Sequence, residues 1–212
     1  MKHCLTFLRH GESESNKLDI LQGQTNSPLS EKGRQQARLV AERWRQAGVG
    51  FDAILSSPLL RAQQTAEIIA QTLGFTGAIE TDSIWIERSF GALEGKPLPE
   101  LRQMQPQVVW WQAFEPIGGS GESQLDLYLR AARGLQGLIR RPPGRYLVVS
   151  HGALLGKLTF AVMGITPQGH NNGIMFLLGN CAYLNVSYDV EKSQFLVYGL
   201  NNPDEFAWMK GP

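Results

Sequence analysis

The chain has 212 residues, 42% of them apolar, which is enough to bury one core and predicts a single domain over residues 1–212. Its formal net charge of +1 argues against nucleic-acid binding, and no apolar run approaches the roughly 20 residues of a membrane span. Because the N-terminus carries no signal-peptide pattern, we expect a cytoplasmic protein that binds a small ligand.

Apolar runs and helical patterns alternate along the chain. The runs predict strands at 4–8, 53–55 and 146–150, with two or three more around 174–178, 182–188 and 194–200. Helices are expected over 31–47 after the N-cap Ser30, over 58–73 after the N-cap Ser57, over 122–141 and over 152–163. The helix over 122–141 is expected to bury a face that contains Leu125, Leu129, Ala132 and Ile139. This alternation predicts an α/β fold, a three-layer α/β/α sandwich in which helices cover both faces of a mostly parallel sheet.

Residues 90–121 interrupt the alternation, because they are rich in Gly, Pro and Gln and carry an aromatic group at Trp110, Trp111 and Phe114. We interpret them as a lid that passes over one edge of the sheet. The two cysteines, Cys4 and Cys181, lie far apart in apolar contexts and lack the spacing of a zinc site or a disulfide framework. They are expected to be reduced core residues.

Two strands end in the same way, the first in Arg9-His10-Gly11 and the other in Ser150-His151-Gly152. Ligands of open α/β sheets bind at the carboxyl ends of the strands. On neighbouring parallel strands the two histidines would emerge about 5 Å apart, a separation that suits one tetrahedral anion. Taken alone, the pattern fits equally well a His10 that caps a strand and an Arg9 that makes a surface ion pair.

Two further residues fit reaction on a phosphate. Arg61 falls in the first turn of a helix, where a cation opposes the helix dipole unless an anion such as a phosphoryl group neutralises it. Glu87 follows an apolar, Trp-containing segment, a context that suits a general acid. The alternatives are a surface salt bridge for Arg61 and an ion pair with Arg88 for Glu87.

The ordered set of motifs resembles the histidine phosphatase superfamily, which includes cofactor-dependent phosphoglycerate mutases and small phosphomonoesterases. The matching segments are 8–13 with Asn16, 28–33, 56–62 with Thr65 and Ala66, Glu87, 90–91, 94–95, 121–123 and 150–152. Asn26 departs from the pattern, since many relatives carry an aspartate there, and we expect this to affect the loop more than the chemistry.

The resemblance implies a role for each site residue. His10 would carry a phosphohistidine intermediate, and Glu87 would be the general acid and base. The transferring phosphoryl group would be bound by Arg9, Asn16, Gly23, Arg61, His151 and Gly152. The resemblance implies no metal and no cofactor, and the partner would be a small phosphomonoester, with no nucleic acid and no membrane. A homodimer is left open.

Three functions remain at this point. A mutase should carry several cations in its lid, whereas residues 90–121 contain only Lys96 and Arg102. Mutases also have a longer insertion here with an Arg-Arg pair, and a His-Tyr after the Glu-Arg, where this chain has Ser89-Phe90 after Arg88. The apolar lid therefore favours a phosphatase that hydrolyses a monoester with an organic leaving group. The phosphoglycerate mutase is the alternative. A non-catalytic phosphate-binding module of the same fold is less favoured, because it would not need the nucleophile His10.

Overall fold

The computed structural model describes residues 1–104, 113–166 and 174–201 of the chain. In this part of the chain, six strands form one sheet in the order β3-β2-β4-β1-β5-β6. The first four strands of this order are parallel, whereas β5 is antiparallel to both β1 and β6. The strands are β1 (Lys2–Arg9), β2 (Ala53–Ser56), β3 (Ile79–Thr81), β4 (Arg145–Ser150), β5 (Tyr183–Asp189) and β6 (Gln194–Asn201).

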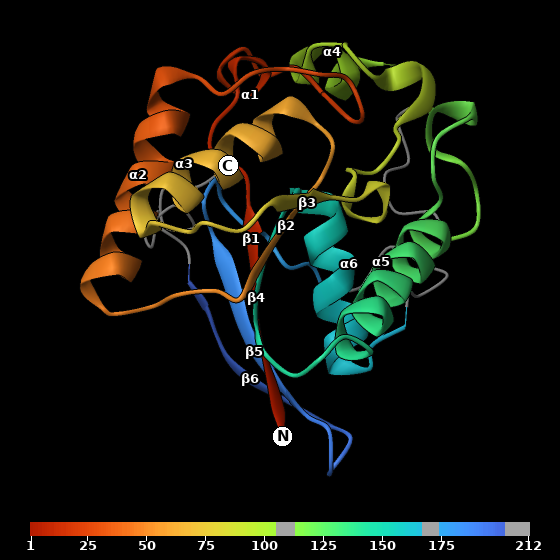
Figure 1. The fold of residues 1–212 in the computed structure, drawn as a ribbon. Helices are drawn as coiled ribbons and strands as arrows, with labels where there is room; N and C mark the ends of the chain where they lie inside the picture. The colour runs from red at the N-terminus through yellow and green to blue at the C-terminus, as the bar shows by residue number, and fades with distance from the viewer. Residues whose placement is uncertain (105–112, 167–173, 202–212) are drawn as a thin grey trace.

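Helices cover both faces of the sheet, α2 and α3 one face and α5 and α6 the other (Figure 1). Their bounds are α2 (Glu31–Gln46), α3 (Leu60–Leu73), α5 (Gln124–Ile139) and α6 (Gly152–Met163). Both faces of β4 are buried, because Tyr146 and Val148 pack with α5 and α6 while Leu147 and Val149 pack with α2 and α3. The α/β fold with helices on both faces is therefore confirmed. Among the described residues, none of the helices combines the length and the apolarity that crossing a membrane requires.

Close backbone packing joins the first loop to α2. A Cβ atom on Gly33 would overlap the carbonyl oxygen of Glu12, so only glycine lets the two segments approach this closely. The carboxylate of Glu12 accepts hydrogen bonds from Ser30 and Lys32, at 2.8 Å each. These contacts fix the loop that leads out of His10 against the start of α2.

The N-terminus of α3 differs from the prediction. The helix begins at Leu60, so its N-cap residue is Leu59 and not Ser57. The side chain of Leu59 forms no capping hydrogen bond. Instead Asn26 reaches in from another loop, where its Oδ1 accepts a hydrogen bond from the backbone N–H of Leu60 at 3.0 Å. The residue that departs from the family pattern is thus a remote helix cap.

Helix α5 buries a different face from the one expected. Its buried apolar residues are Leu127, Ala131, Leu135 and Leu138, whereas Leu129 is 42% exposed. Both sets have helical spacing, so periodicity alone does not choose between them. Gly134 lies against the Trp85 ring, where a Cβ atom would be only 2.8 Å from it, and this close approach accompanies the observed orientation.

The apolar run at 174–178 is not a strand, although the strands predicted after it are present as β5 and β6. Residues 175–178 line a cavity, and Phe176 packs edge-on against Phe160 with ring centroids 5.5 Å apart. The run is apolar because it forms a cavity wall. Of the two cysteines, Cys181 is buried but Cys4 is exposed, so the prediction of a core position is wrong for Cys4.

The described part of the lid contains α4 (Leu98–Gln103) and the 3-10 helices η2 (Gly91–Leu93) and η3 (Ile117–Gly119). Two short elements lie outside the lid, α1 (Glu14–Lys17) after β1 and the 3-10 helix η1 (Ser83–Trp85) before the lid. A small core of Phe90, Leu93, Leu101 and Ile117 holds the lid together above the carboxyl ends of the parallel strands (Figure 1). Trp110 and Trp111 lie outside the described residues. Phe114 is 70% exposed.

Candidate active site

The two histidine corners meet at one edge of the sheet. Strand β1 pairs in parallel with β4 so that Arg9 lies opposite Ser150, and the histidines follow directly. The N–H of His10 continues the ladder by donating to the carbonyl of Ser150 at 3.0 Å. The two imidazole centroids are 5.0 Å apart, as neighbouring parallel strands lead one to expect.

Hydrogen bonds fix the tautomer of the His10 ring. Nδ1 lies 2.6 Å from the carbonyl oxygen of Gly11, which can only accept, so Nδ1 carries the proton. Nε2 then holds a lone pair, and Nε of Arg61 donates to it at 3.2 Å. Burial lowers the pKa of His10 well below its usual value, and the charges of Arg61 and Arg9 lower it further. His10 is therefore a neutral imidazole with Nε2 as its nucleophilic atom.

Arg61 is 1% exposed, which excludes the surface salt bridge considered for it. Its guanidinium donates to the carbonyl oxygens of Gly23 and Thr25 at 2.8 Å each, in addition to its contact with His10. Burial lowers the pKa of Arg61 to about 10, so the side chain stays charged at neutral pH. A positive charge is thus held rigidly beside the nucleophilic nitrogen.

Two buried nitrogen atoms next to His10 have no hydrogen-bond partner in the described structure, Nε of Arg9 and Nδ1 of His151. Arg9 is held by another of its nitrogens, which donates to the carbonyl of Leu178 at 2.6 Å. Such buried, unpartnered donors are costly unless a ligand accepts from them. An anionic oxygen at this place would accept from Nε of Arg9 and from His151.

His151 is held from the other side by Ser57, whose Oγ lies 2.7 Å from Nε2. Ser57 Oγ also accepts a hydrogen bond from the N–H of Leu59 at 3.2 Å, so its own proton is free to go to His151. When Ser57 donates to Nε2, the proton of His151 lies on Nδ1, the unpartnered atom. Burial, followed by the charge of Arg61, lowers the pKa of His151 well below its usual value.

The other three residues expected to bind phosphate lie around this group. Asn16 uses its Oδ1 to accept from Ser13 and from Asn180, which leaves its amide nitrogen for the cavity that it lines. Gly23 contributes its carbonyl to Arg61. Gly152, the first residue of α6, lies against the guanidinium of Arg9.

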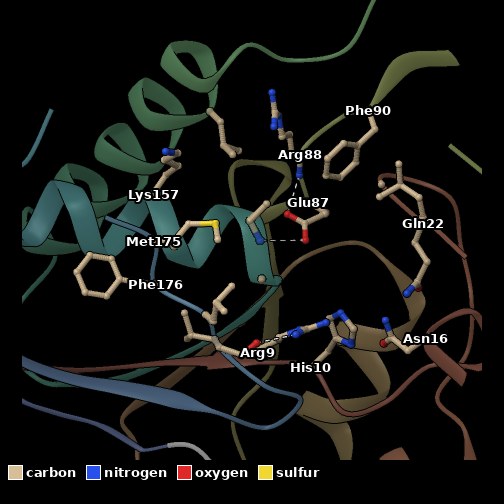
Figure 2. A pocket seen from close by; sticks show the side chains of 18 of the residues that line it. Arg9, His10, Asn16, Gln22, Glu87, Arg88, Phe90, Lys157, Met175 and Phe176 are labelled. Carbon is tan, nitrogen blue, oxygen red and sulfur yellow. Dashed lines mark hydrogen bonds between the residues drawn. The ribbon is translucent and has the colours of Figure 1, made fainter. Parts of the chain in front are cut away.

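Glu87 lies at the N-terminus of α6, across the cavity from His10 (Figure 2). Its carboxylate accepts hydrogen bonds from the backbone N–H groups of Arg88, Ala153 and Leu154 at 2.8, 3.3 and 3.2 Å. Its backbone carbonyl accepts from Arg130, on α5, at 3.1 Å and from Gln24 at 3.0 Å. The carboxylate is thus positioned through both its side chain and its main chain.

A cavity of about 350 Å³ connects these residues. The cavity is lined by Arg9, His10, Asn16, Gly23, Arg61, Glu87 and Gly152. His151 is not among the lining residues, although its ring centroid is 5.0 Å from that of His10. The rest of the wall is mainly apolar and includes Leu98, Phe90, Phe160, Met175 and Phe176. In the described part of the chain, no group of three or more His, Cys, Asp or Glu residues is arranged to hold a metal ion.

Several residues of the site were not found from the sequence. Ser57 follows β2 at the same sheet edge as the two histidines, so its position after a strand was an available signal. Asn180 lies in the loop before β5, and Arg130 forms a 2.7 Å ion pair with Glu122 while it supports Glu87. For these two residues no motif or periodicity in the sequence pointed to the site.

Comparison with known proteins gives a consistent result. A probable phosphoglycerate mutase from Yersinia pestis (strain Pestoides F) is 37% identical over 198 residues, which cover 91% of this chain and 87% of that relative. A mycobacterial glucosyl-3-phosphoglycerate phosphatase, solved in complex with VO3, has a TM-score of 0.79 at 25% identity and covers 94% of this chain and 99% of that one. A mutant phosphoserine phosphatase from Entamoeba histolytica, solved with phosphoserine, has a TM-score of 0.74 at 26% identity and covers 94% of this chain and 96% of that one.

The model of the histidine phosphatase superfamily (branch 1) matches residues 5–201. This match spans both histidine corners, Arg61 and Glu87, and the neighbouring structures share the sheet and helices that gather them. The chain therefore belongs to the histidine phosphatase superfamily, branch 1.

Proposed function

We propose that this protein is a metal-independent phosphatase that hydrolyses a small phosphomonoester through a phosphohistidine on His10. The observation that carries the proposal is the fixed tautomer of His10, with Nδ1 bonded to Gly11 and Nε2 beside Arg61. A neutral, oriented imidazole whose unprotonated Nε2 lies beside a positive charge is suited to attack on a phosphate ester.

In the first step, Nε2 of His10 forms a bond to phosphorus while the bond from phosphorus to the leaving oxygen breaks. Glu87 gives its proton to that oxygen, and the alcohol leaves. In the second step, the Glu87 carboxylate takes a proton from water as the water oxygen attacks phosphorus and the P–N bond breaks. Phosphate is released, and His10 and Glu87 return to their starting states.

The remaining site residues would hold the transferring phosphoryl group. Arg9, Arg61 and His151 would contact its oxygens together with the amide of Asn16, while Gly23 anchors Arg61 and Gly152 packs against Arg9. Two buried guanidinium groups would offset the charge that develops on these oxygens, a role that Mg²⁺ has in other phosphoryl-transfer enzymes.

A second candidate is a phosphoglycerate mutase, favoured by the name of the Yersinia pestis relative. The two lid cations, Lys96 and Arg102, are not among the residues that line the cavity. Two other cations, Arg88 and Lys157, do line the cavity, and a count of the cations in the lid did not include them because they lie outside the lid. The mainly apolar wall supports hydrolysis of an ester with an organic leaving group.

The test uses p-nitrophenyl phosphate with and without EDTA. We expect EDTA to leave turnover unchanged and a rapid quench to trap an acid-labile phosphoenzyme, which His10→Ala abolishes together with turnover. The control is His3→Gln, since His3 is buried near Tyr146 and Tyr188 and outside the cavity lining. Normal turnover by His10→Ala would refute the mechanism. Rapid isomerisation of 3-phosphoglycerate in the presence of its bisphosphate would favour the mutase instead.

A further inference from the structure

Two cations line the cavity on the side away from the nucleophile. Figure 2 shows His10 and Arg9 on one side of the cavity, and Lys157 and Arg88 on the opposite side beyond Glu87. The phosphoryl group has its own positive charges beside His10. The second pair of cations therefore faces whatever part of the substrate extends away from phosphorus, which is the leaving group.

Lys157 lies on α6, about one and a half turns from its start, and is half-buried. Its ammonium group is 4.5 Å from the centroid of the Phe160 ring, which is a cation–π contact. Among the described residues no carboxylate pairs with Lys157 and no acceptor bonds to its ammonium group. A half-buried ammonium without a counter-ion is unfavourable, because its hydration is reduced and the contact with the Phe160 ring replaces only part of it.

Arg88 adds a second positive charge at this end of the cavity and is 3% exposed. Its Nε donates to the carbonyl of Glu122 at 3.0 Å, so the structure already holds part of this guanidinium. Burial and, to a lesser extent, the charge of Arg88 together lower the pKa of Lys157 to about 8. Lys157 is thus mostly protonated at neutral pH, and an anion beside it would relieve the repulsion between the two cations.

We propose that Lys157 is a specificity-determining residue that binds a carboxylate on the leaving group of the substrate. The preferred substrates are then small phosphomonoesters of hydroxy acids, an inference that rests on the proposed hydrolysis at His10. One free ammonium matches the single charge of a carboxylate better than the charge of about −1.5 to −2 of a second phosphate. Phe160, Met175 and Phe176 would cover the carbon atoms between the two anionic ends.

The test compares two substrates that differ only in the group concerned. 3-Phosphoglycerate ends in a carboxylate where glycerol 3-phosphate ends in a hydroxymethyl group. We expect wild-type protein to release phosphate from 3-phosphoglycerate with the higher kcat/KM. Lys157→Met should lower kcat/KM for 3-phosphoglycerate by about ten- to a hundredfold, mainly through KM, because a charged hydrogen bond is lost. Turnover of glycerol 3-phosphate should stay within about threefold, a margin within the scatter expected for a changed apolar wall.

Two further variants separate charge from structure. Lys157→Arg keeps the charge and should keep most of the preference for 3-phosphoglycerate. Lys192→Met removes an exposed lysine in the turn between β5 and β6 and should change neither substrate. An equal loss in Lys157→Arg and Lys157→Met, or an unchanged preference in Lys157→Met, would overturn the proposal.

A measurement on the unmodified protein covers the case in which Lys157→Met does not fold. The ratio of kcat/KM for the two substrates should fall above about pH 8 as Lys157 loses its proton. If p-nitrophenyl phosphate is hydrolysed but the ratio stays flat between pH 7 and pH 9.5, the assignment of Lys157 is wrong. The same holds if the wild-type protein shows no preference for 3-phosphoglycerate over glycerol 3-phosphate. Absence of any phosphoenzyme would instead contradict the proposed function itself.

Discussion

Nε2 of His151 lies 2.7 Å from Oγ of Ser57, and this bond joins the carboxyl ends of β4 and β2. Both side chains are fully buried, so the hydroxyl determines how the imidazole is oriented beside His10. The contact makes Ser57 a positioning residue, because it acts on the phosphoryl site through His151.

Ser57→Ala should therefore weaken catalysis without removing the nucleophile. We expect kcat for p-nitrophenyl phosphate to fall by about ten- to a hundredfold, less than when a direct transition-state donor is removed. The phosphoenzyme should still form in single-turnover experiments, but more slowly. The matched control is Ser56→Ala, because among the described residues the buried hydroxyl of Ser56 bonds only to the carbonyl of Ser57, and this variant should keep near-normal kcat. A larger effect in the control would show that the loss comes from general disruption of β2.

Glu87→Gln should separate substrates by their leaving groups. For glycerol 3-phosphate, whose alkoxide needs a proton, kcat should fall by about 10²–10⁴-fold, the usual range for a lost general acid. For p-nitrophenyl phosphate, whose leaving group departs without protonation, formation of the phosphoenzyme should be much less affected. The control is Glu94→Gln, since Glu94 bonds to the N–H of Phe90 and does not line the cavity. Equal losses in the rate of phosphoenzyme formation from the two substrates would argue against Glu87 as the proton donor.

The two buried histidines should make the protein less stable in mild acid. Burial and the nearby arginines lower the pKa of both His10 and His151 well below the usual 6.5. Above pH 6.5 both the folded and the unfolded chain hold these rings neutral, so this contribution to stability is fully present. Below pH 6.5 the unfolded chain takes up protons that the folded chain refuses, and the free energy of unfolding falls.

For the pair, the loss between pH 7.5 and pH 5.5 should be about 2–3 kcal/mol, from 1.4 kcal/mol per pH unit and histidine. Urea unfolding at the two pH values measures it. The double variant with His10→Gln and His151→Gln should lose most of this pH dependence and retain a smaller part from His3, whose pKa burial also lowers. An unchanged pH dependence in the double variant would place its origin elsewhere.

Gly23 combines a left-handed backbone with crowding next to the site. Its φ is +52°, and a Cβ atom would overlap the side chain of Glu94, which bonds to the N–H of Phe90 at 2.8 Å. Gly23→Ala should destabilise the protein by about 2–4 kcal/mol, the sum of backbone strain and overpacking. Because the Gly23 carbonyl anchors Arg61, kcat should also fall.

Gly74→Ala is the matched control for that substitution. Gly74 has a φ of +68° at the end of α3, with no atom within 4 Å of an added Cβ. It should cost only about 1–2 kcal/mol of backbone strain and leave kcat unchanged. Thermal unfolding and turnover are measured for both variants. Equal destabilisation would show that the Glu94 side chain moves away from the added methyl group without an energetic penalty.

Much of this protein follows from local sequence. Apolar runs that end in His10 and His151 determine two buried parallel strands, since only a strand with both faces covered is apolar at successive positions. The spacing of Ala62, Ala66 and Ile69 likewise determines the buried face of α3. Parallel strands end at the same edge of a sheet, so the meeting of the two histidines could also be expected.

Other features depend on contacts between segments far apart in the chain, which no local pattern encodes. Tertiary packing decided which of two equally periodic faces of α5 is buried, and the buried face is the one that places Gly134 against Trp85. Tertiary packing also places Ser57 in contact with His151, and it places Asn26 where its side chain caps α3. Only the folded cavity brought Lys157 and Arg88 to its far wall, since helical spacing alone does not show where the end of a long side chain lies.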